Sequence, residues 1–302
     1  MSRRFEIFFD GTWQEKDQEN ESNVAKLFSS VQPGPGDEVL YLPGVGTGVL
    51  HFTGGLFGIG LSSQILHAYS WLRDQRPTRG DRITLTGFSR GSYAARSFSG
   101  LLYHCGIRAG DVDDIYRMYR ERAKDAKTAA AAGITPRIAH LLVFDTVGAL
   151  GVPSPLGFPL TDCQFHDTSL SPLVQNATHL VALQETRRHY VPTLFTDANE
   201  PDGNVEELWC PGSHSDVGGG GENEYLSLYS LHYAVRRMAM FGTPFREGTA
   251  AKIVRMIDGT AKKDRRRNRL SSSWLWPEKT RVPPPGAIHA PWTNQELLSL
   301  PG

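Results

Sequence analysis

The sequence predicts an α/β fold in which helices flank a mostly parallel central sheet. Short apolar runs that suit strands alternate along the chain with longer runs of helical spacing, a pattern typical of strand–helix–strand units. One serine, Ser89, lies in a sharp turn between such a strand and such a helix. Hydrophobic residues make up 39% and charged residues 21% of the 302 residues, which is ordinary for a globular domain.

Five segments are predicted to be strands because they are short, apolar and bounded by turn residues. The run His140-Leu-Leu-Val-Phe144, for example, is compact and ends at Asp145. The predicted strands are 3–9, 37–42, 81–87, 140–146 and 205–210. Ligands of open α/β sheets bind at the carboxyl ends of the strands, so we expect the functional residues there.

Helices are predicted between the strands, where apolar residues recur three and four positions apart. The predicted helices are 62–76, 90–104, 111–132, 170–188 and 224–241. The spacing within 170–188 places His179 on or beside a packed helix face. We expect a single domain over 1–302, with a catalytic core over about 3–240 and a basic, proline-rich segment over 258–302.

Ser89 has the sequence context of a nucleophile elbow, Gly87-Phe-Ser-Arg-Gly91. In this strand–turn–helix motif the serine has a strained backbone, and a Cβ two residues away on either side would collide with the turn. The two glycines therefore allow the hydroxyl to project toward a substrate. The alternative is an ordinary glycine-flanked strand end.

A nucleophilic serine needs a base, and the base needs an orienting acid. The chain order Ser, Asp, His of α/β-hydrolases is met by Asp145 and His214, each of which follows a predicted strand. His179 and His289 are the rival bases, and Asp216 is the rival acid. We favour His214 because a Pro-Gly turn and a glycine run surround it, and Asp145 because Asp216 would have to fold back onto the ring.

An oxyanion hole needs two N–H donors, one of them from the residue after the nucleophile, here Arg90. The second is predicted at Gly11, directly after the first strand. Asp10 and Thr12 are further site candidates, although they also fit a simple Asx turn.

Six ordered motifs together resemble one bacterial and fungal α/β-hydrolase family of unknown function, which includes the first class of type VI secretion lipase effectors. The motifs are Phe9-Asp-Gly-Thr-Trp13, Asn23-Val-Ala-Lys-Leu-Phe28, Leu42-Pro-Gly-Val-Gly-Thr47, Gly87-Phe-Ser-Arg-Gly-Ser-Tyr-Ala-Ala-Arg96, Phe144-Asp-Thr-Val-Gly-Ala-Leu-Gly151 and Pro211-Gly-Ser-His-Ser-Asp-Val-Gly-Gly-Gly220. The resemblance implies a serine lipase or phospholipase. At 302 residues the chain leaves no room for a further membrane-anchoring domain, so the resemblance does not by itself predict secretion as a toxin.

Composition excludes several other classes. Lys plus Arg equals Asp plus Glu, 32 each, so no overall field attracts nucleic acid. Cys105, Cys163 and Cys210 are too widely spaced for a zinc site, and their odd number does not suit a disulfide framework. We expect reduced thiols, neither metal nor cofactor, and a cytoplasmic protein without signal peptide or transmembrane segment. Signal-less export and the oligomeric state stay open.

Three segments could govern access to Ser89 or to a lipid surface. The glycine-rich stretch 44–60 has the composition of a lid, and 151–172 suits a pocket wall. The segment 262–269 holds six basic residues, and Trp274 and Trp276 follow it. Such a segment suits peripheral membrane contact, and its alternative is a solvated loop.

These observations predict a serine hydrolase that cleaves carboxyl esters, most of all those of lipids, through Ser89, His214 and Asp145. The alternatives are an esterase for small soluble molecules and an inactive module that binds an acyl group or a protein.

Overall fold

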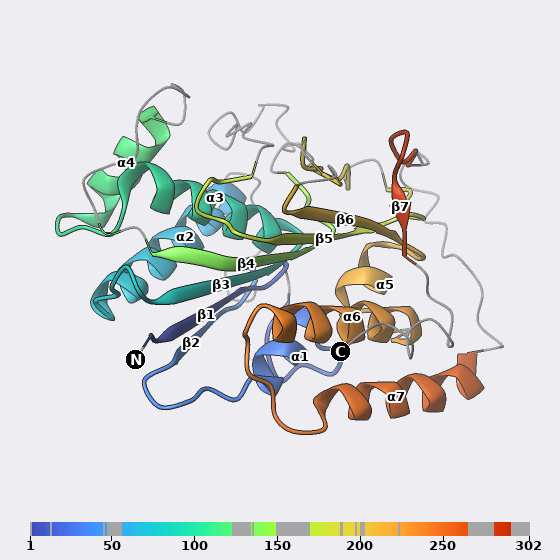
Figure 1. Ribbon diagram of the computed structural model, residues 1–302. Helices are drawn as coiled ribbons and strands as arrows, with labels where there is room; N and C mark the ends of the chain where they lie inside the picture. Colours follow the sequence, from blue (N-terminus) through green and yellow to red (C-terminus); the bar gives the residue numbers. More distant parts are fainter. Residues whose placement is uncertain are drawn as a thin grey trace.

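The computed structural model describes residues 2–12, 14–44, 46, 56–122, 134, 136–148, 170–187, 190–196, 198–199, 203–222, 224–264 and 281–290. Its centre is a seven-stranded, fully parallel sheet with the order β2-β1-β3-β4-β5-β6-β7 (Figure 1). The strands are β1 (Arg4–Phe9), β2 (Glu38–Leu42), β3 (Arg82–Phe88), β4 (Arg137–Phe144), β5 (Ala177–Ala182), β6 (Val205–Cys210) and β7 (Ile288–His289). The predicted α/β fold with a parallel sheet is confirmed.

Helices cover both faces of the sheet. They are α1 (Asn23–Ser30), α2 (Leu56–Asp74), α3 (Arg90–Cys105), α4 (Val112–Arg122), α5 (His214–Gly218), α6 (Tyr225–Met240) and α7 (Thr249–Asp264). α2, α3 and α4 lie on one side, whereas α1, α5, α6 and α7 lie on the other (Figure 1). Each side has its own hydrophobic core, because the strands are buried on both faces.

The strand order changes direction between β1 and β3. The chain passes from β1 to β2 on one side and then returns to β3 on the other side of β1. Phe9 is in register with Gly87, so β1 and β3 end at the same level. The turns that follow them, at Asp10 and at Ser89, therefore meet at the switch point of the sheet, where ligands of such folds bind.

One predicted helix is wrong. The segment expected to be helical over 170–188 contains β5, which pairs with β4 and β6. All six residues of β5 are buried, including the polar Thr178 and His179, so the strand has no alternation of buried and exposed positions and the helical spacing of its apolar residues was accidental. His179 therefore lies in the sheet and not on a helix face.

Several boundaries and short elements also differ from the sequence prediction. α2 begins at Leu56, inside the stretch expected to be a glycine-rich loop. The predicted helix 111–132 is described as α4, Val112–Arg122. Several parts of the sequence prediction lie outside the described residues. They are most of the lid before Leu56, the pocket wall over 151–169, Cys163, the basic residues from Arg265 on, Trp274 and Trp276.

Candidate active site

Ser89 forms the turn between β3 and α3 with a positive φ of 57°. A Cβ on Gly87 would lie 2.6 Å from the Cα of Ser92, and one on Gly91 would lie 2.2 Å from the carbonyl oxygen of Phe9. Both approaches are far shorter than a van der Waals contact, so only glycine fits at these positions. This strained, glycine-dependent turn is what a nucleophile elbow requires.

The backbone of Ser89 is tied to the end of the next strand. Its N–H donates to the carbonyl of Phe144 at 2.9 Å, and its carbonyl accepts from the N–H of Val147 at 3.3 Å. These two residues flank Asp145, which follows β4 and has a positive φ of 39°. The serine turn and the aspartate turn therefore hold each other at the carboxyl edge of the sheet.

Asp145 and His214 are in direct contact, as predicted from their order in the chain. Nδ1 of His214 lies 2.6 Å from Oδ2 of Asp145, and both side chains are buried. His214 is the first residue of α5, directly after the β6 turn. With Nδ1 bound to the carboxylate, the opposite ring nitrogen is available as a base.

Aromatic rings from two elements fix the plane of the His214 ring. Its centroid lies 4.7 Å from that of Phe88, the residue before Ser89, and 4.7 Å from that of Tyr190. The N–H of His214 donates to Oε2 of Glu185 at 3.1 Å, and Glu185 forms an ion pair with Arg187. The base is therefore held by its backbone, by its ring and by the acid.

The surroundings of Asp145 and His214 lower the pKa of both groups, for different reasons. Burial by itself would raise the pKa of Asp145, but the hydrogen bond and charge of His214, together with the guanidinium of Arg281, hold that pKa well below its usual range. Burial lowers the pKa of His214, against the opposing effect of Asp145. At neutral pH the pair is thus a carboxylate and a neutral imidazole, which is the state needed for general-base catalysis.

The rival candidates have other roles. Asp216 accepts from the N–H and the hydroxyl of Ser213, both at 2.8 Å, and so caps α5. His289 is exposed on β7. His179 is buried in β5, where Nδ1 lies 2.9 Å from Oε2 of Glu207 and Nε2 accepts from the N–H of Thr146 at 3.1 Å.

The turn after β1 ends at the same level as the turn of Ser89, and its polar groups bind one another. Asp10 is buried and accepts from Ser22 and Tyr41, both at 2.6 Å, and burial raises its pKa to about 6. The N–H of Gly11 donates to Oδ1 of Asp10 at 2.7 Å, so in this structure it serves the turn and not an oxyanion. Oγ1 of Thr12 is buried without a hydrogen-bond partner among the described residues.

Arg90 has the position expected of an oxyanion donor. It opens α3, so its N–H lies in the first helical turn, at the positive end of the helix dipole. Burial lowers the pKa of its guanidinium.

Sequence reasoning missed Arg281. Both of its terminal nitrogens reach Asp145, with Nη1 at 2.6 Å from Oδ1 and Nη2 at 3.0 Å from Oδ2. The residue lies 136 positions after Asp145, in a segment without a recognisable motif, so no local signal in the sequence could have found it.

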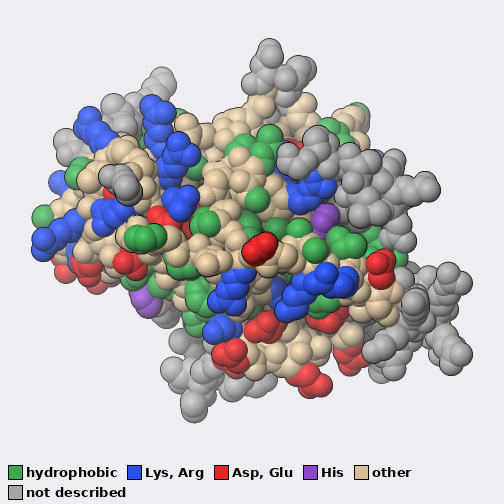
Figure 2. All heavy atoms as spheres, turned by 60° about the horizontal axis from the view of Figure 1, so that its bottom comes forward, with side chains coloured by type: hydrophobic (Ala, Val, Ile, Leu, Met, Phe, Trp, Pro, Cys, Tyr) green, Lys and Arg blue, Asp and Glu red, His purple; other side chains and the backbone are tan. Residues whose placement is uncertain are grey.

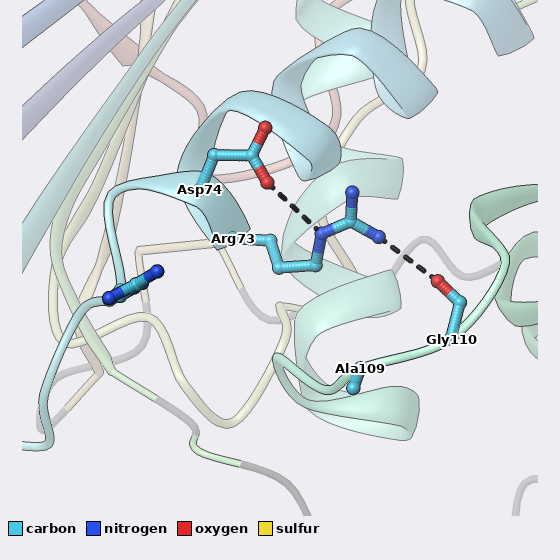
Figure 3. A pocket seen from close by; sticks show the side chains of 5 residues that line it. Arg73, Asp74, Ala109 and Gly110 are labelled. Atoms are coloured by element: carbon cyan, nitrogen blue, oxygen red, sulfur yellow. Dashed lines mark hydrogen bonds and ion pairs between the residues drawn. The ribbon is translucent and has the colours of Figure 1, made fainter.

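Two further features lie on the surface of the molecule. A pocket of about 450 Å³ is lined by Arg73, Asp74, Arg76, Ala109 and Gly110. There Arg73 contacts Asp74 and donates to the carbonyl of Gly110 (Figure 3). It lies at the end of α2 that precedes β3, and thus at the opposite edge of the sheet from Ser89. Figure 2 shows acidic and basic side chains interspersed on the side that carries α1, α6 and α7.

Within the described ranges, no group of three or more His, Cys, Asp or Glu side chains is placed to hold a metal ion. Over the same part of the chain, no helix has the length and apolar character needed to cross a bilayer. Cys105 and Cys210 are both buried.

Comparison with known proteins shows related sequences. A family model described as the catalytic domain of the Tle1-like phospholipase effector of the type VI secretion system matches residues 3–237. The uncharacterized protein YEL023C of Saccharomyces cerevisiae is 24% identical over 227 residues, which are 63% of this chain and 32% of the yeast protein. This chain thus spans about a third of the length of that relative.

Three solved structures are similar to this chain at low sequence identity. An uncharacterized protein from Pseudomonas aeruginosa is 18% identical, with a TM-score of 0.49 over 85% of this chain and 48% of that chain. The Tle1 effector bound to the VgrG spike is 19% identical, with a TM-score of 0.45 over 74% of this chain and 52% of that chain. Esterase 2 of Thermogutta terrifontis, phosphorylated by paraoxon, is 15% identical, with a TM-score of 0.45 over 80% of this chain and 84% of that chain.

Proposed function

Because the chain belongs to the family of Tle1-like phospholipase effector catalytic domains, we propose that it is a serine hydrolase that cleaves carboxyl esters of lipids. One observation carries the proposal: the buried Asp145–His214 pair, 2.6 Å apart, lies beside the strained turn of Ser89. A neutral imidazole that is oriented by a carboxylate and adjacent to a serine elbow is the arrangement of acyl-transfer enzymes.

The reaction follows from these three side chains. Ser89 Oγ attacks the acyl carbonyl while His214 accepts its proton, and Asp145 stabilises the imidazolium that forms. His214 then gives the proton to the leaving alcohol, which leaves an acyl group on Ser89. Water attacks the acyl-enzyme with His214 again as the base, so that the fatty acid is released and the serine is restored.

The oxyanion of the tetrahedral intermediate needs two donors. The N–H of Arg90 supplies the first, at the start of α3. For the second, Gly11 would have to release Asp10, whereas the buried hydroxyl of Thr12 has no competing partner among the described residues. We therefore extend the proposal to Thr12 as a donor alongside Arg90 and Gly11.

A lipid substrate is supported by the family and by one segment of the sequence. Six basic residues over 262–269 precede Trp274 and Trp276, a composition suited to the surface of an anionic bilayer. Neutralising Arg265, Arg266 and Arg267 should lower hydrolysis of anionic vesicles and leave hydrolysis of a water-soluble ester nearly unchanged. The difference should shrink at high salt, because salt screens the attraction. Equal loss on both substrates would contradict a role in docking.

The direct test is product analysis. The wild type, Ser89→Ala and the matched control Ser99→Ala are incubated with a mixed phospholipid extract, and the products are identified by mass spectrometry. The hydroxyl of Ser99 donates to the carbonyl of Arg96 within α3, away from Asp145 and His214, so its removal should leave the activity intact. Fatty acid and lysolipid from the wild type and the control, but not from Ser89→Ala, are expected. Turnover of soluble esters alone would favour the small-molecule esterase, and no turnover at all would favour a binding module.

A further inference from the structure

Arg281 occupies a position that the proposed chemistry leaves unexplained. Its side chain is only 7% exposed, although it follows the family-matched region, which ends at residue 237. Nη1 donates to Oδ1 of Asp145 at 2.6 Å and to the carbonyl of Ala182 at 2.7 Å. Nη2 donates to Oδ2 of Asp145 at 3.0 Å and to the carbonyl of Tyr190. All four hydrogens of the two terminal nitrogens are therefore used.

The same bonds complete the coordination of the carboxylate. Oδ1 of Asp145 accepts from the N–H of Ala182 at 2.9 Å and from Arg281, and Oδ2 accepts from His214 and from Arg281. Two carboxylate oxygens have about four acceptor sites, so none remains for another donor. A carboxylate held from three directions cannot turn away from the imidazole.

The chain around Arg281 is anchored to the sheet. Ile288 and His289 pair with Leu208 and Trp209 of β6, and the N–H of Ala290 donates to the carbonyl of Trp209 at 3.0 Å. β7 thus forms the edge strand next to β6, whose following turn leads to His214 (Figure 1). The segment 281–290 is fixed at the sheet edge by β7 and at the acid by Arg281.

We infer that Arg281 is a positioning residue for the active site, which the C-terminal segment completes by clamping Asp145 in the orientation that receives the Nδ1–H of His214. This inference rests on the proposed function for its catalytic consequence, but not for the contact itself. Arginine suits the role because its planar fork meets both carboxylate oxygens at once, which the single ammonium of lysine cannot do.

The clamp has a second, electrostatic consequence. Arg281 lies one hydrogen bond beyond Asp145 and partly neutralises it, so it weakens the pull of the carboxylate on the imidazole proton. The other groups that face His214 are Glu185 and Arg187, with the rings of Tyr190 and Phe88. Of these groups, Tyr190 is itself tied to Arg281 through its carbonyl. Removal of the Arg281 charge should raise the pKa of His214, because the carboxylate then attracts the imidazole proton more strongly.

The experiment measures two quantities in parallel, the pKa of His214 in the unlabelled full-length protein and the reactivity of Ser89. NMR titration of the imidazole gives the pKa of His214, and the rate of labelling by a fluorophosphonate gives the reactivity of Ser89. The variants are Arg281→Gln, which removes the charge, and Arg281→Lys, which keeps a charge but not the fork. Arg255→Gln is the matched control, because Arg255 is an exposed residue of α7.

We expect Arg281→Gln to raise the pKa of His214 and to slow labelling at pH 7 by about 10-fold or more, a size typical of residues that orient a reacting group through another. Arg281→Lys should keep the pKa near its wild-type value and still slow labelling, and Arg255→Gln should change neither quantity. Added guanidinium should restore part of the rate of Arg281→Gln.

Unchanged pKa and labelling rate in both Arg281 variants would overturn the inference. If Arg281→Gln does not fold, the labelling rate of Arg281→Lys decides. An unaltered rate in that variant would show that the two-pronged contact of the guanidinium with Asp145 is not needed, and would overturn the inference. A wild type that is not labelled, but in which the pKa of His214 still responds to Arg281, would overturn the proposed function and leave the clamp standing.

Discussion

Replacement of Asp145 by asparagine tests the acid assignment with little change of shape. The amide of asparagine offers one acceptor oxygen and one NH₂ donor, whereas both oxygens of Asp145 accept hydrogen bonds. If the NH₂ takes the place of Oδ2, it faces Nδ1 of His214, and the imidazole must adopt the other tautomer. If it takes the place of Oδ1, it faces the N–H of Ala182 and the guanidinium of Arg281.

The first arrangement removes the base. With Nδ1 as acceptor, the proton lies on Nε2 of His214, which then cannot accept the proton of Ser89. A loss of about 10⁴-fold in kcat is expected for such a tautomer change, equivalent to about 5 kcal/mol in the activation free energy. The second arrangement keeps the tautomer but leaves two buried donors without an acceptor, at about 1–3 kcal/mol each in the free energy of unfolding.

Asp216→Asn is the matched control, because it makes the same chemical change two positions after His214. Its remaining oxygen can still accept from the N–H of Ser213, so the helix cap is only weakened, by about 1 kcal/mol or less. We expect its kcat to stay within about threefold of the wild type.

The assay is hydrolysis of a water-soluble ester near pH 8, with thermal unfolding to show that each variant is folded. A folded Asp145→Asn variant within tenfold of the wild type in activity and with an unchanged free energy of unfolding would refute the reasoning, because neither arrangement of the amide allows both. So would an inactive, folded Asp216→Asn variant beside an active Asp145→Asn.

Three further predictions concern pH, burial and the elbow. The rate of ester hydrolysis should rise with pH with a midpoint below 6.5, the ordinary pKa of an imidazole, because burial lowers the pKa of His214 and only the neutral ring accepts a proton; a pH–rate profile with its midpoint above 6.5 would contradict this. Burial raises the pKa of Glu6 from 4.5 to about 7, so the wild type loses stability as pH rises through that range. Glu6→Gln should accordingly be more stable than the wild type at pH 8, by up to about 3 kcal/mol in urea unfolding, with a gap that closes toward pH 4.5 and does not widen. Gly91→Ala should abolish activity and lower the Tm, because its Cβ would lie 2.2 Å from a backbone oxygen, whereas Gly259→Ala, with open space around it in α7, should unfold at the same or a higher temperature.

The parts of the site that lie in local motifs could be predicted from the sequence. The elbow around Ser89 has its two glycines at fixed offsets, and these are the positions where a Cβ would collide with the backbone. Asp145 and His214 were proposed together because each follows a strand in the required order, and the structure shows them in contact. The sequence could not decide between Asp145 and Asp216 as the acid, and the structure favours Asp145 because Asp216 caps its own helix.

The features that the sequence analysis did not predict have two physical causes. β5 was predicted as a helix because a strand buried on both faces has no alternation to reveal it. Arg281, and the backbone contact of Glu185 with His214, depend on tertiary contacts between distant segments, which leave no local pattern. The oxyanion role of the Gly11 N–H stays a prediction, and the contact that the sequence did not indicate is its hydrogen bond to the side chain of Asp10.

The central claim is that Ser89 is a nucleophile activated by His214. Its most direct test is covalent labelling by a fluorophosphonate, followed by peptide mapping of the adduct in the wild type, Ser89→Ala and His214→Ala. The account predicts one adduct on Ser89, none in Ser89→Ala, and labelling slowed by about 10³-fold or more in His214→Ala, since the two residues act as a unit. An adduct on another residue, or equally fast labelling of Ser89 without His214, would contradict it.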